Sequence, residues 1–437
     1  MTRVVVIGAG VAGLVAAIRL ARAGASVALL AKGTGGLQLS QGTIDILGYG
    51  PDRVERPLDA LADFAEANPG HPYAFLDAEL VGSSASYVAE LVGSELLVGD
   101  PAVNLQLPTA VGAVRPTALA SPSMTAGACV DGARFVIVGL RQLKDFYPEL
   151  VAYNLNRTDL SSLGLAGGGR LEARPAMLSF PAREHEVDSS GLTYARALDD
   201  PGTRKRFAEA VKPLVKEGES VGLPAVLGLD DHGAWAEIAE LLGTDVFEIP
   251  LPPPSVPGMR LNRTLTAIAK ASGVRVVPGS KVTGFRSGGG SVNCVQLATA
   301  GGIREFAADA FVLATGGFES GALHADSYHN LHESIFDLPL RRAEGALVHG
   351  DYWGDPQPLF LAGVETDTDL RVRHPGGDVV YDNLYAAGGI LAGATRWQEK
   401  SGEGIAVASA VRAADSILAA ADGAAAAHGT TTEGAAS

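Results

Sequence analysis

The first thirty residues combine apolar runs and glycines in a pattern typical of a βαβ unit. The β-branched run 4–7 predicts a fully buried parallel strand. An apolar, alanine-rich stretch from about Ala12 to Ala23 predicts a helix that ends at Gly24, and Ser26–Ala31 predicts a second strand. The pattern therefore indicates two parallel strands that are connected by one helix.

A G-x-G-x-x-G motif, made of Gly8, Gly10 and Gly13, lies between the first strand and this helix. In such a turn the first glycine permits the tight bend, and the second lets a phosphate approach the backbone. The third glycine lets the helix pack closely on the strand. The free N–H groups at the start of the helix then attract an anion. The motif predicts a nucleotide-type cofactor site.

The long segment 52–255 contains two apolar strands that are each followed by a helical pattern. The first pair is 134–140 with 144–155, and the second is 222–229 with 234–242. This order predicts an inserted α/β domain for a substrate or a partner. The proline-rich segment 250–255 cannot be a helix or a central strand, so we expect the chain to return to the cofactor domain there.

After this hinge the pattern predicts a helix and then a β-meander. The helix is expected over Leu261–Ala271, and strands are expected over 274–277, 281–285, 292–299 and 306–314. The last strand ends in Thr315 and Gly316, an ending typical of flavoproteins with two dinucleotide folds.

A third strand-to-glycine element, 382–389, precedes the final helix, which is expected from Ala406 to about Ala420. In flavoproteins of this kind the strand end, here Gly388, lies beside the ribityl chain. The helix N-terminus, here Gly402, Gly404 and Ile405, faces the flavin edge that becomes negative on reduction. Glu403 places an acid near that edge.

These elements predict an α/β protein with a Rossmann-like FAD/NAD(P)-binding flavoprotein fold and an inserted α/β domain. The flavin-binding domain is expected to be discontinuous, over 1–51, 256–320 and 375–422. The insertion is expected over 52–255, with 321–374 as a cap or second part. We expect 423–437 to be a disordered, low-complexity tail.

Composition and charge exclude several classes of protein. The chain has 437 residues, of which 47% are hydrophobic and 19% charged, so it can form a large core. A net charge of −15 argues against a nucleic-acid partner and against a polybasic membrane patch. Cys129 and Cys294 have no metal-ligand spacing, so we expect no disulfide, no cysteine-ligated metal and a reducing cytosol. We also expect no signal peptide and no transmembrane helix.

Candidates for catalysis are few. His71 lies on a constrained turn before Pro72 and is equally suited to cap a helix, while Arg260 and Arg263 could bind a phosphate or carboxylate. The spacing of His324, His329 and His332 fits no standard zinc signature, so no metal site is expected.

The second strand predicts which flavin is bound. An FAD site usually has an acid at this strand end to bind the adenosine ribose. Here Ala31 and Lys32 stand instead, which favours FMN over the alternative FAD, with Lys32 a candidate for the phosphate. In the loop that follows, Ser40 and Gly42 are expected to lie along the flavin ring.

Together these motifs resemble the B subunit of anaerobic glycerol-3-phosphate dehydrogenase over almost the whole chain. The resemblance rests on the glycine turn and on short motifs spread along the sequence. These motifs are Ser40-x-Gly42-x-x-Asp45, His71-Pro72-Tyr73, Pro253-Pro254-Ser255-Val256 with Arg260-Leu261, Pro356-Gln357-Pro358 and Gly363-Val364-x-Thr366-Asp367.

The resemblance implies an FMN-bearing enzyme subunit. It would pair with an FAD-containing A subunit, and an iron–sulfur C subunit would anchor both to the cytoplasmic face of the membrane. The complex would oxidise sn-glycerol 3-phosphate to dihydroxyacetone phosphate and pass the electrons to quinone in anaerobic respiration. Two alternatives stay open: an independent succinate/fumarate-type flavoprotein that acts on another small acid, and a flavin-free scaffold.

Overall fold

The computed structural model describes residues 1–163, 169–299, 301–342, 345–351 and 354–433. The chain divides into two compact units. Unit 1 consists of Met1–Gly36, Leu61–Ser84 and Leu265–Ser437, and unit 2 consists of Leu37–Ala60 and Ala85–Thr264.

The centre of unit 1 is a five-stranded sheet in the order β11-β2-β1-β15-β20. All neighbouring strands in it are parallel. The strands are β1 (Arg3–Ile7), β2 (Ser26–Ala31), β11 (Arg275–Pro278), β15 (Ala310–Leu313) and β20 (Leu384–Ala386). This order confirms the Rossmann-like fold that the glycine turn and the β-branched runs predict.

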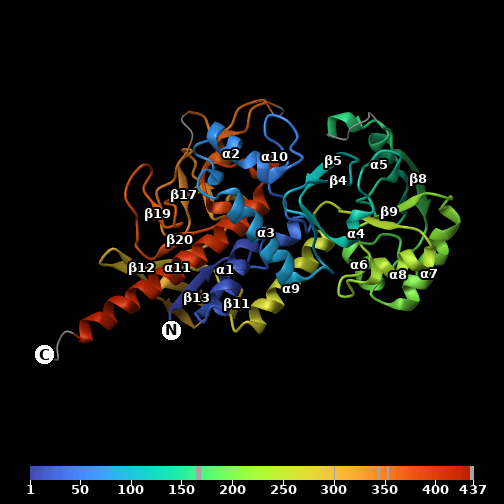
Figure 1. The fold of residues 1–437 in the computed structure, drawn as a ribbon. Coiled ribbons are helices and arrows are strands. Elements are labelled where there is room, and N and C mark those ends of the chain that lie inside the picture. The colour runs from blue at the N-terminus through green and yellow to red at the C-terminus, as the bar shows by residue number, and fades with distance from the viewer. Residues whose placement is uncertain (164–168, 300, 343–344, 352–353, 434–437) are drawn as a thin grey trace. The chain divides into compact units, whose positions relative to one another are not determined.

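Two helices lie side by side in unit 1, α1 (Val11–Arg22) and α11 (Gly402–Glu433) (Figure 1). The apolar residues of α1 are almost fully buried. An ion pair of 2.6 Å joins Arg19 of α1 to Asp415 of α11. The first helix therefore covers the sheet as expected, and the last helix packs against the first.

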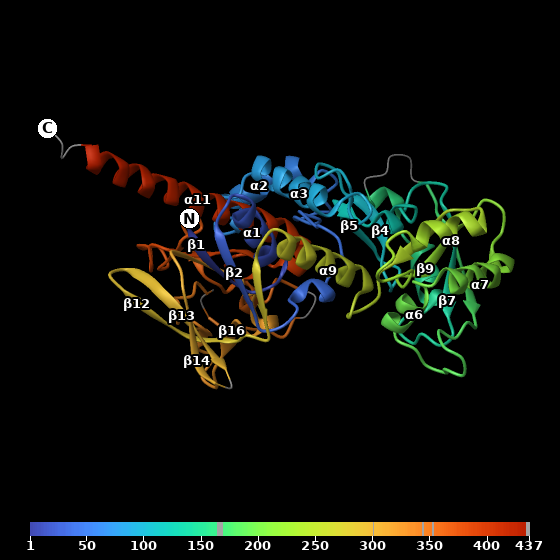
Figure 2. The same ribbon diagram turned by 90° about the horizontal axis from the view of Figure 1, so that it is seen from below.

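The meander expected after residue 274 is present as an antiparallel sheet, β12-β13-β14 (Figure 2). Its strands are β12 (Val282–Gly288), β13 (Ser291–Thr299) and β14 (Gly302–Ala307). The single strand expected over 306–314 is wrong, because the chain passes from β14 to β15 at Asp309. Asp309 lies between the two strands, and its carboxylate accepts a hydrogen bond of 2.8 Å from the backbone N–H of Arg3, the first residue of β1.

Shorter elements complete unit 1. Two hairpins are formed by β16 (Leu323–Ala325) with β17 (Leu331–Glu333), and by β18 (Glu365–Thr366) with β19 (Val372–Arg373). The short helix α10 (Arg396–Glu399) directly precedes α11. A 3₁₀ turn, Pro72–Ala74, lies between α2 (Pro57–Ala67) and α3 (Ala78–Val92).

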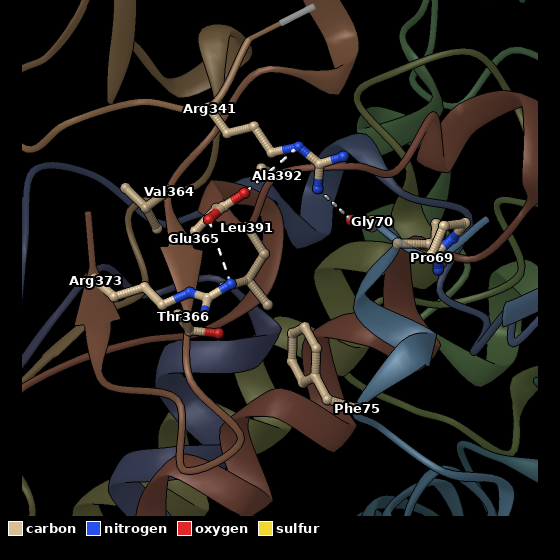
Figure 3. A pocket seen from close by; sticks show the side chains of 11 residues that line it. Pro69, Gly70, Phe75, Arg341, Val364, Glu365, Thr366, Arg373, Leu391 and Ala392 are labelled. Atoms are coloured by element: carbon tan, nitrogen blue, oxygen red, sulfur yellow. Dashed lines mark hydrogen bonds and ion pairs between the residues drawn. The ribbon is translucent and has the colours of Figure 1, made fainter. Parts of the chain in front are cut away.

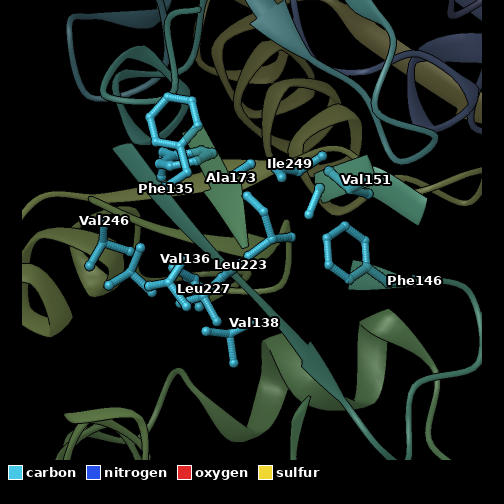
Figure 4. Close-up of a cluster of buried hydrophobic side chains, with 14 of the residues drawn as sticks. Phe135, Val136, Val138, Phe146, Val151, Ala173, Leu223, Leu227, Val246 and Ile249 are labelled. Carbon is cyan, nitrogen blue, oxygen red and sulfur yellow. The ribbon is translucent and has the colours of Figure 1, made fainter. Parts of the chain in front are cut away.

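Unit 2 contains a parallel four-stranded sheet in the order β10-β9-β7-β8, as the strand-then-helix pattern predicts. A large apolar cluster that includes Phe135, Val136, Leu223 and Phe247 forms its core (Figure 4). The strands are β7 (Arg134–Leu140), β8 (Glu172–Leu178), β9 (Ser220–Pro224) and β10 (Val246–Ile249). The helices are α4 (Pro122–Thr125), α5 (Pro148–Leu155), α6 (Gly191–Ala197), α7 (Pro201–Val211) and α8 (Ala234–Leu242). Two small pairs, β3 (Val98–Gly99) with β6 (Leu119–Ala120) and β4 (Leu105–Pro108) with β5 (Val114–Thr117), also belong to unit 2.

The boundaries between the units differ from those expected. Segment 61–84 belongs to unit 1, although the sequence pattern predicts it in the insertion, and 37–51 belongs to unit 2. Segment 321–374 lies in unit 1. The chain returns to unit 1 inside α9 (Val256–Ala271), between residues 264 and 265, and not at the proline-rich segment before it.

The C-terminal helix is longer than expected. The sequence predicts disorder from residue 423, but α11 continues to Glu433. Alanine, the strongest helix former, occupies positions 424–427 of this extension. Residues 434–437 lie outside the described residues. The stretch Gly402–Gly423 is long and apolar enough to cross a membrane, yet 61% of its apolar window is buried within the protein. Since it also carries the paired Asp415, we interpret it as a core helix.

Candidate functional site

The glycine turn of unit 1 is built so that only its middle glycine faces open space. Gly8 has a φ of +114°, and a Cβ atom added to it would lie 2.2 Å from the Ala314 carbonyl oxygen. A Cβ on Gly13 would lie 1.9 Å from the Gly8 oxygen. A Cβ on Gly10 would meet nothing within 4 Å. The protein itself therefore requires Gly8 and Gly13, whereas the space at Gly10 is free for a ligand.

The segment after β15 brings a second set of polar groups to this turn. Gly8 lies against Ala314. Thr315 and Gly316 are the next two residues of the chain, so both lie close to the glycine turn. The hydroxyl oxygen of Thr315 is buried, and no hydrogen-bond partner for it is found among the described residues. A buried hydroxyl without a partner costs free energy unless a bound group satisfies it.

Gly388, at the end of β20, lies between the N-terminal turns of α1 and α11. A Cβ on Gly388 would lie 2.9 Å from the Cβ of Ala12 and 3.7 Å from that of Ala406. Its N–H donates a hydrogen bond of 2.9 Å to the hydroxyl of Ser409. Gly388 therefore lies against the first turn of α1 and the second turn of α11, near the N-terminal ends of both helices, whose dipoles favour a negatively charged group.

Arg396, which no sequence motif marks, connects these glycine segments. Its Nη1 donates a hydrogen bond of 2.6 Å to the Gly389 carbonyl, and its Nη2 lies 3.6 Å from Glu319. A Cβ on Gly389 would lie 3.4 Å from the Cα of Gly316. The guanidinium therefore adds a positive charge where the strand ends of β15 and β20 approach each other.

His71 fixes a turn and does not project freely into a site. Its Nδ1 accepts a hydrogen bond of 3.1 Å from the backbone N–H of Tyr73, so it caps the 3₁₀ turn Pro72–Ala74. This assigns the ring hydrogen to Nε2, which lies 3.1 Å from a carboxylate oxygen of Glu399. The residue is 2% exposed. The capping role, one of the two roles that the sequence predicts for this histidine, is thus present.

Glu399 in turn organises the chain just before α11. It accepts hydrogen bonds from the N–H and hydroxyl of Thr395, at 2.7 and 2.8 Å, and from the Ser401 hydroxyl at 2.7 Å. Burial works against its charge, but the hydrogen bonds from His71, Ser401 and Thr395 together hold the pKa of Glu399 below its usual value. Glu399 therefore connects His71 to the residues that directly precede Gly402 and Gly404, where the last helix begins. Ile405, one turn along, is buried and donates its N–H to the Ser401 carbonyl.

The other expected cofactor residues lie in different surroundings. Lys32 is exposed at the end of β2 in unit 1. Ser40 and Gly42 belong to unit 2, where the Ser40 hydroxyl donates to the Leu37 carbonyl at 2.9 Å. Gly42 has a φ of +73°, and a Cβ on it would lie 2.6 Å from the backbone of Pro257. The part these three play in a cofactor site stays a prediction.

The two arginine candidates of unit 2 already have protein partners. Arg260 is 3% exposed, and its Nη1 lies 2.6 Å from Glu248, which is itself fully buried. Its Nε donates to the Gly228 carbonyl at 2.8 Å. Arg263 forms an exposed ion pair with Asp230. Arg260 therefore stabilises the interior of unit 2, and neither arginine belongs to the candidate site of unit 1.

The residues of unit 1 thus fit a flavin. Gly10 and the start of α1 offer space and N–H groups for a phosphate. The unpartnered Thr315 hydroxyl, the start of α11 and Arg396 offer donors for oxygen or nitrogen atoms of an extended polar ligand. All of these groups come from four separate segments of the chain that meet at the carboxyl ends of parallel strands.

Comparison with known proteins agrees with this assignment. The family model described as "FAD binding domain" matches residues 3–405. A relative from Halobacterium salinarum, named as the B subunit of a "Probable anaerobic glycerol-3-phosphate dehydrogenase", is 32% identical over 423 residues, which cover 93% of this chain and 95% of the relative. A relative from Yersinia enterocolitica, named as the B subunit of an anaerobic glycerol-3-phosphate dehydrogenase, is 31% identical over 435 residues, which cover 95% and 98%.

Among solved structures, the chain is similar to a 3-ketosteroid delta1-dehydrogenase from Sterolibacterium denitrificans. The match covers 96% of this chain and 100% of that one, at 12% sequence identity and a TM-score of 0.44.

Proposed function

We propose, from the premise that this chain belongs to the family of anaerobic glycerol-3-phosphate dehydrogenase B subunits, that it is the flavin-bearing subunit of such a dehydrogenase. The complex oxidises sn-glycerol 3-phosphate to dihydroxyacetone phosphate. In this reaction the secondary alcohol loses two electrons and two protons to become a ketone. A bound flavin supplies the two-electron acceptor.

The observation that supports this proposal is the convergence of the glycine segments of unit 1. Gly8 contacts Ala314, Gly388 contacts the N-terminal turns of α1 and α11, and Gly389 lies beside Gly316. Because these contacts surround the free space at Gly10 and the unpartnered Thr315 hydroxyl, a ligand bound there touches several segments at once. A flavin-free scaffold has no need for such an arrangement.

The chain's own residues bind and orient the cofactor in this proposal. The N–H groups at the start of α1 hold the flavin phosphate next to Gly10. The N-terminus of α11 and the guanidinium of Arg396 place positive charge where an anionic flavin edge is stabilised. His71 and Glu399 act as positioning residues, because they fix the turn from which α11 begins.

We propose FMN as the flavin and FAD as the alternative. Ala31 is 3% exposed at the end of β2, and its backbone oxygen accepts a hydrogen bond from Ser280. A methyl side chain cannot accept the bonds that an acid accepts from an adenosine ribose, and the following Lys32 offers only donors. Lys32, at the surface, suits a terminal phosphate.

The family to which the chain belongs is the basis for the partners that we propose. We propose an FAD-containing A subunit and an iron–sulfur C subunit, with this chain held at the cytoplasmic face of the membrane through them. Electrons then reach quinone through the partners. The names of the relatives support only that the chain is one subunit of a larger enzyme.

Cofactor analysis tests this function directly. Purified protein should carry close to one flavin per chain, and heat-released cofactor should run with FMN on reversed-phase chromatography. Ala31→Glu should leave FMN binding unchanged or weaker. A flavin peak at FAD alone would reject FMN, in which case Ala31→Glu should tighten FAD binding. Protein without any flavin would reject the proposed function itself.

A further inference from the structure

A pocket in unit 1 lies next to the glycine segments and contains two arginine side chains. Its wall includes Leu391 and Ala392, which directly follow the 3₁₀ turn Gly388–Ile390 (Figure 3). The cavity itself is small, about 90 Å³, and it opens to solvent.

The two guanidinium groups flank one carboxylate. The Nε of Arg341 lies 3.6 Å from one oxygen of Glu365, and the Nη2 of Arg373 lies 3.5 Å from the other (Figure 3). Charge-assisted hydrogen bonds are normally about 2.7–2.9 Å long, so Glu365 binds both arginines only loosely. The three groups together carry one net positive charge, which favours an anionic ligand.

Two buried polar atoms of this pocket have no protein partner in the described part of the chain. They are the Nε of Arg373 and the hydroxyl oxygen of Thr366, and Thr366 as a whole is 7% exposed. Glu365 and Thr366 are consecutive residues of β18, and Glu365 is paired with Arg373 across the hairpin. A buried N–H and a buried hydroxyl without partners point to a ligand that accepts hydrogen bonds from both.

The pocket is held firmly to the proposed flavin segment. The backbone N–H of Val364 donates to the Ile390 carbonyl at 2.9 Å, and that of Ala392 donates to the Val364 carbonyl at 3.0 Å. The Nη1 of Arg341 donates to the Gly70 carbonyl at 2.8 Å, so this arginine also connects the pocket to the turn before His71. The hairpin, the end of β20 and the turn before His71 therefore form one wall.

We propose that this pocket binds the phosphate and a hydroxyl group of a small phosphorylated polyol, and under the proposed function this polyol is sn-glycerol 3-phosphate. Phosphate oxygens accept hydrogen bonds from Arg341, Arg373 and the Thr366 hydroxyl. Glu365 cannot bond an anionic oxygen but accepts a hydrogen bond from an alcohol. A dicarboxylate such as succinate offers no hydroxyl, so its second carboxylate would meet Glu365 as a like charge.

Calorimetric titration of the purified flavin-loaded chain with sn-glycerol 3-phosphate tests this site. Removing one charged hydrogen-bond donor in Arg373→Gln should raise the Kd about 10- to 100-fold. Thr366→Val keeps the shape and removes only the hydroxyl, so it should raise the Kd about 2- to 10-fold. Glycerol and succinate should bind more weakly than sn-glycerol 3-phosphate.

Arg371→Gln is the matched control. Arg371 lies next to β19 and forms its ion pair with Asp367 instead, so the same loss of charge outside the pocket should leave the Kd within about twofold. The inference is overturned by any of three results: no binding of sn-glycerol 3-phosphate to the wild-type chain, equal Kd values in Arg373→Gln and Arg371→Gln, or succinate that binds as tightly as the phosphate ester.

The failure of this site and the failure of the proposed function give different results. If the flavin-loaded chain binds sn-glycerol 3-phosphate with the same Kd after substitution of Arg373 and of Thr366, the pocket proposal is rejected and the proposed function is unaffected. If the chain carries no flavin but still binds the phosphate ester through Arg373, the proposed function is rejected and the pocket proposal is unaffected. Should Arg373→Gln lose its flavin through misfolding, Thr366→Val decides between these outcomes.

Discussion

At the scale of single residues, the three glycines of the first turn have different structural roles. Gly8 and Gly13 are required by the protein, because a side chain on either would collide with backbone atoms at 2.2 and 1.9 Å. Gly10 has ordinary extended backbone angles, and its missing side chain leaves space that no protein atom fills. Under the proposed function, this space admits the flavin phosphate.

This difference predicts opposite results for two substitutions. Gly10→Val should abolish flavin binding and change the free energy of unfolding of the flavin-free protein by about 1 kcal/mol or less. Gly13→Ala should lower the free energy of unfolding of the flavin-free protein by about 1–3 kcal/mol, because the backbone of Gly8 must move away from the added methyl group. Flavin absorbance and urea denaturation measure the two effects. A Gly10→Val protein that keeps a full flavin complement would place the phosphate elsewhere.

At the scale of elements, the start of α11 depends on a carboxylate that lies outside the helix. Glu399 receives hydrogen bonds from His71, Thr395 and Ser401, and its side chain is 13% exposed. In Glu399→Gln, an amide N–H₂ would face the hydrogens of His71 and Ser401. His71 cannot change its tautomer without losing the bond from Tyr73.

We therefore expect Glu399→Gln to lower the free energy of unfolding by about 1–3 kcal/mol at neutral pH. Because the pKa of Glu399 is lower in the folded than in the unfolded protein, the carboxylate stabilises the fold fully above its ordinary pKa of about 4.5. This contribution is lost as the pH falls through the lowered pKa of the folded state.

Urea denaturation of wild type and variant from about pH 8 to pH 4 measures this dependence. The difference between the two proteins should be constant above about pH 6 and should shrink below about pH 4.5. Glu66→Gln, at an exposed position of α2, is the control and should match the wild type throughout. A difference that persists unchanged at the acid end of this range would contradict the role of the charge.

At the scale of the whole molecule, the chain is one acidic subunit with two compact units. The net charge is −15, and the relatives that match nearly its full length are each named as a B subunit. A negative net charge of this size opposes the attraction of the whole chain to an anionic lipid surface. Under the proposed function, partners must carry its electrons to a membrane quinone.

The isolated chain should therefore show little or no glycerol-3-phosphate:quinone oxidoreductase activity, and the activity should return when A- and C-type subunits are added. Co-purification of the three chains followed by quinone reduction in detergent measures this. The flavin-loaded chain alone is the control. Full activity from that single chain would contradict the need for partners.

Local patterns along the chain were sufficient to predict much of the fold. The strand, turn and helix of residues 3–22 are predictable from neighbouring residues, because β-branched runs, alanine periodicity and the glycine spacing are signals within one βαβ unit. The same holds for α8 and β7, whose predicted bounds match the structure. The local pattern misses the break at Asp309, where β15 begins to pair with β1 and Asp309 bonds to Arg3, 306 residues away.

Tertiary structure alone decided which of these parts meet. The contact between His71 and Glu399 joins residues 328 apart in sequence. Arg396, which follows β20, lies 3.6 Å from Glu319, which follows the neighbouring strand β15. The Arg341–Glu365–Arg373 group likewise depends on a hairpin whose pairing no local pattern marks. Glycine spacing and apolar periodicity are local signals, so the sequence by itself was sufficient to predict the flavoprotein fold. Hydrogen bonds between distant polar side chains form only after the backbone has folded. Only the tertiary structure therefore shows which polar residues lie together in the candidate site.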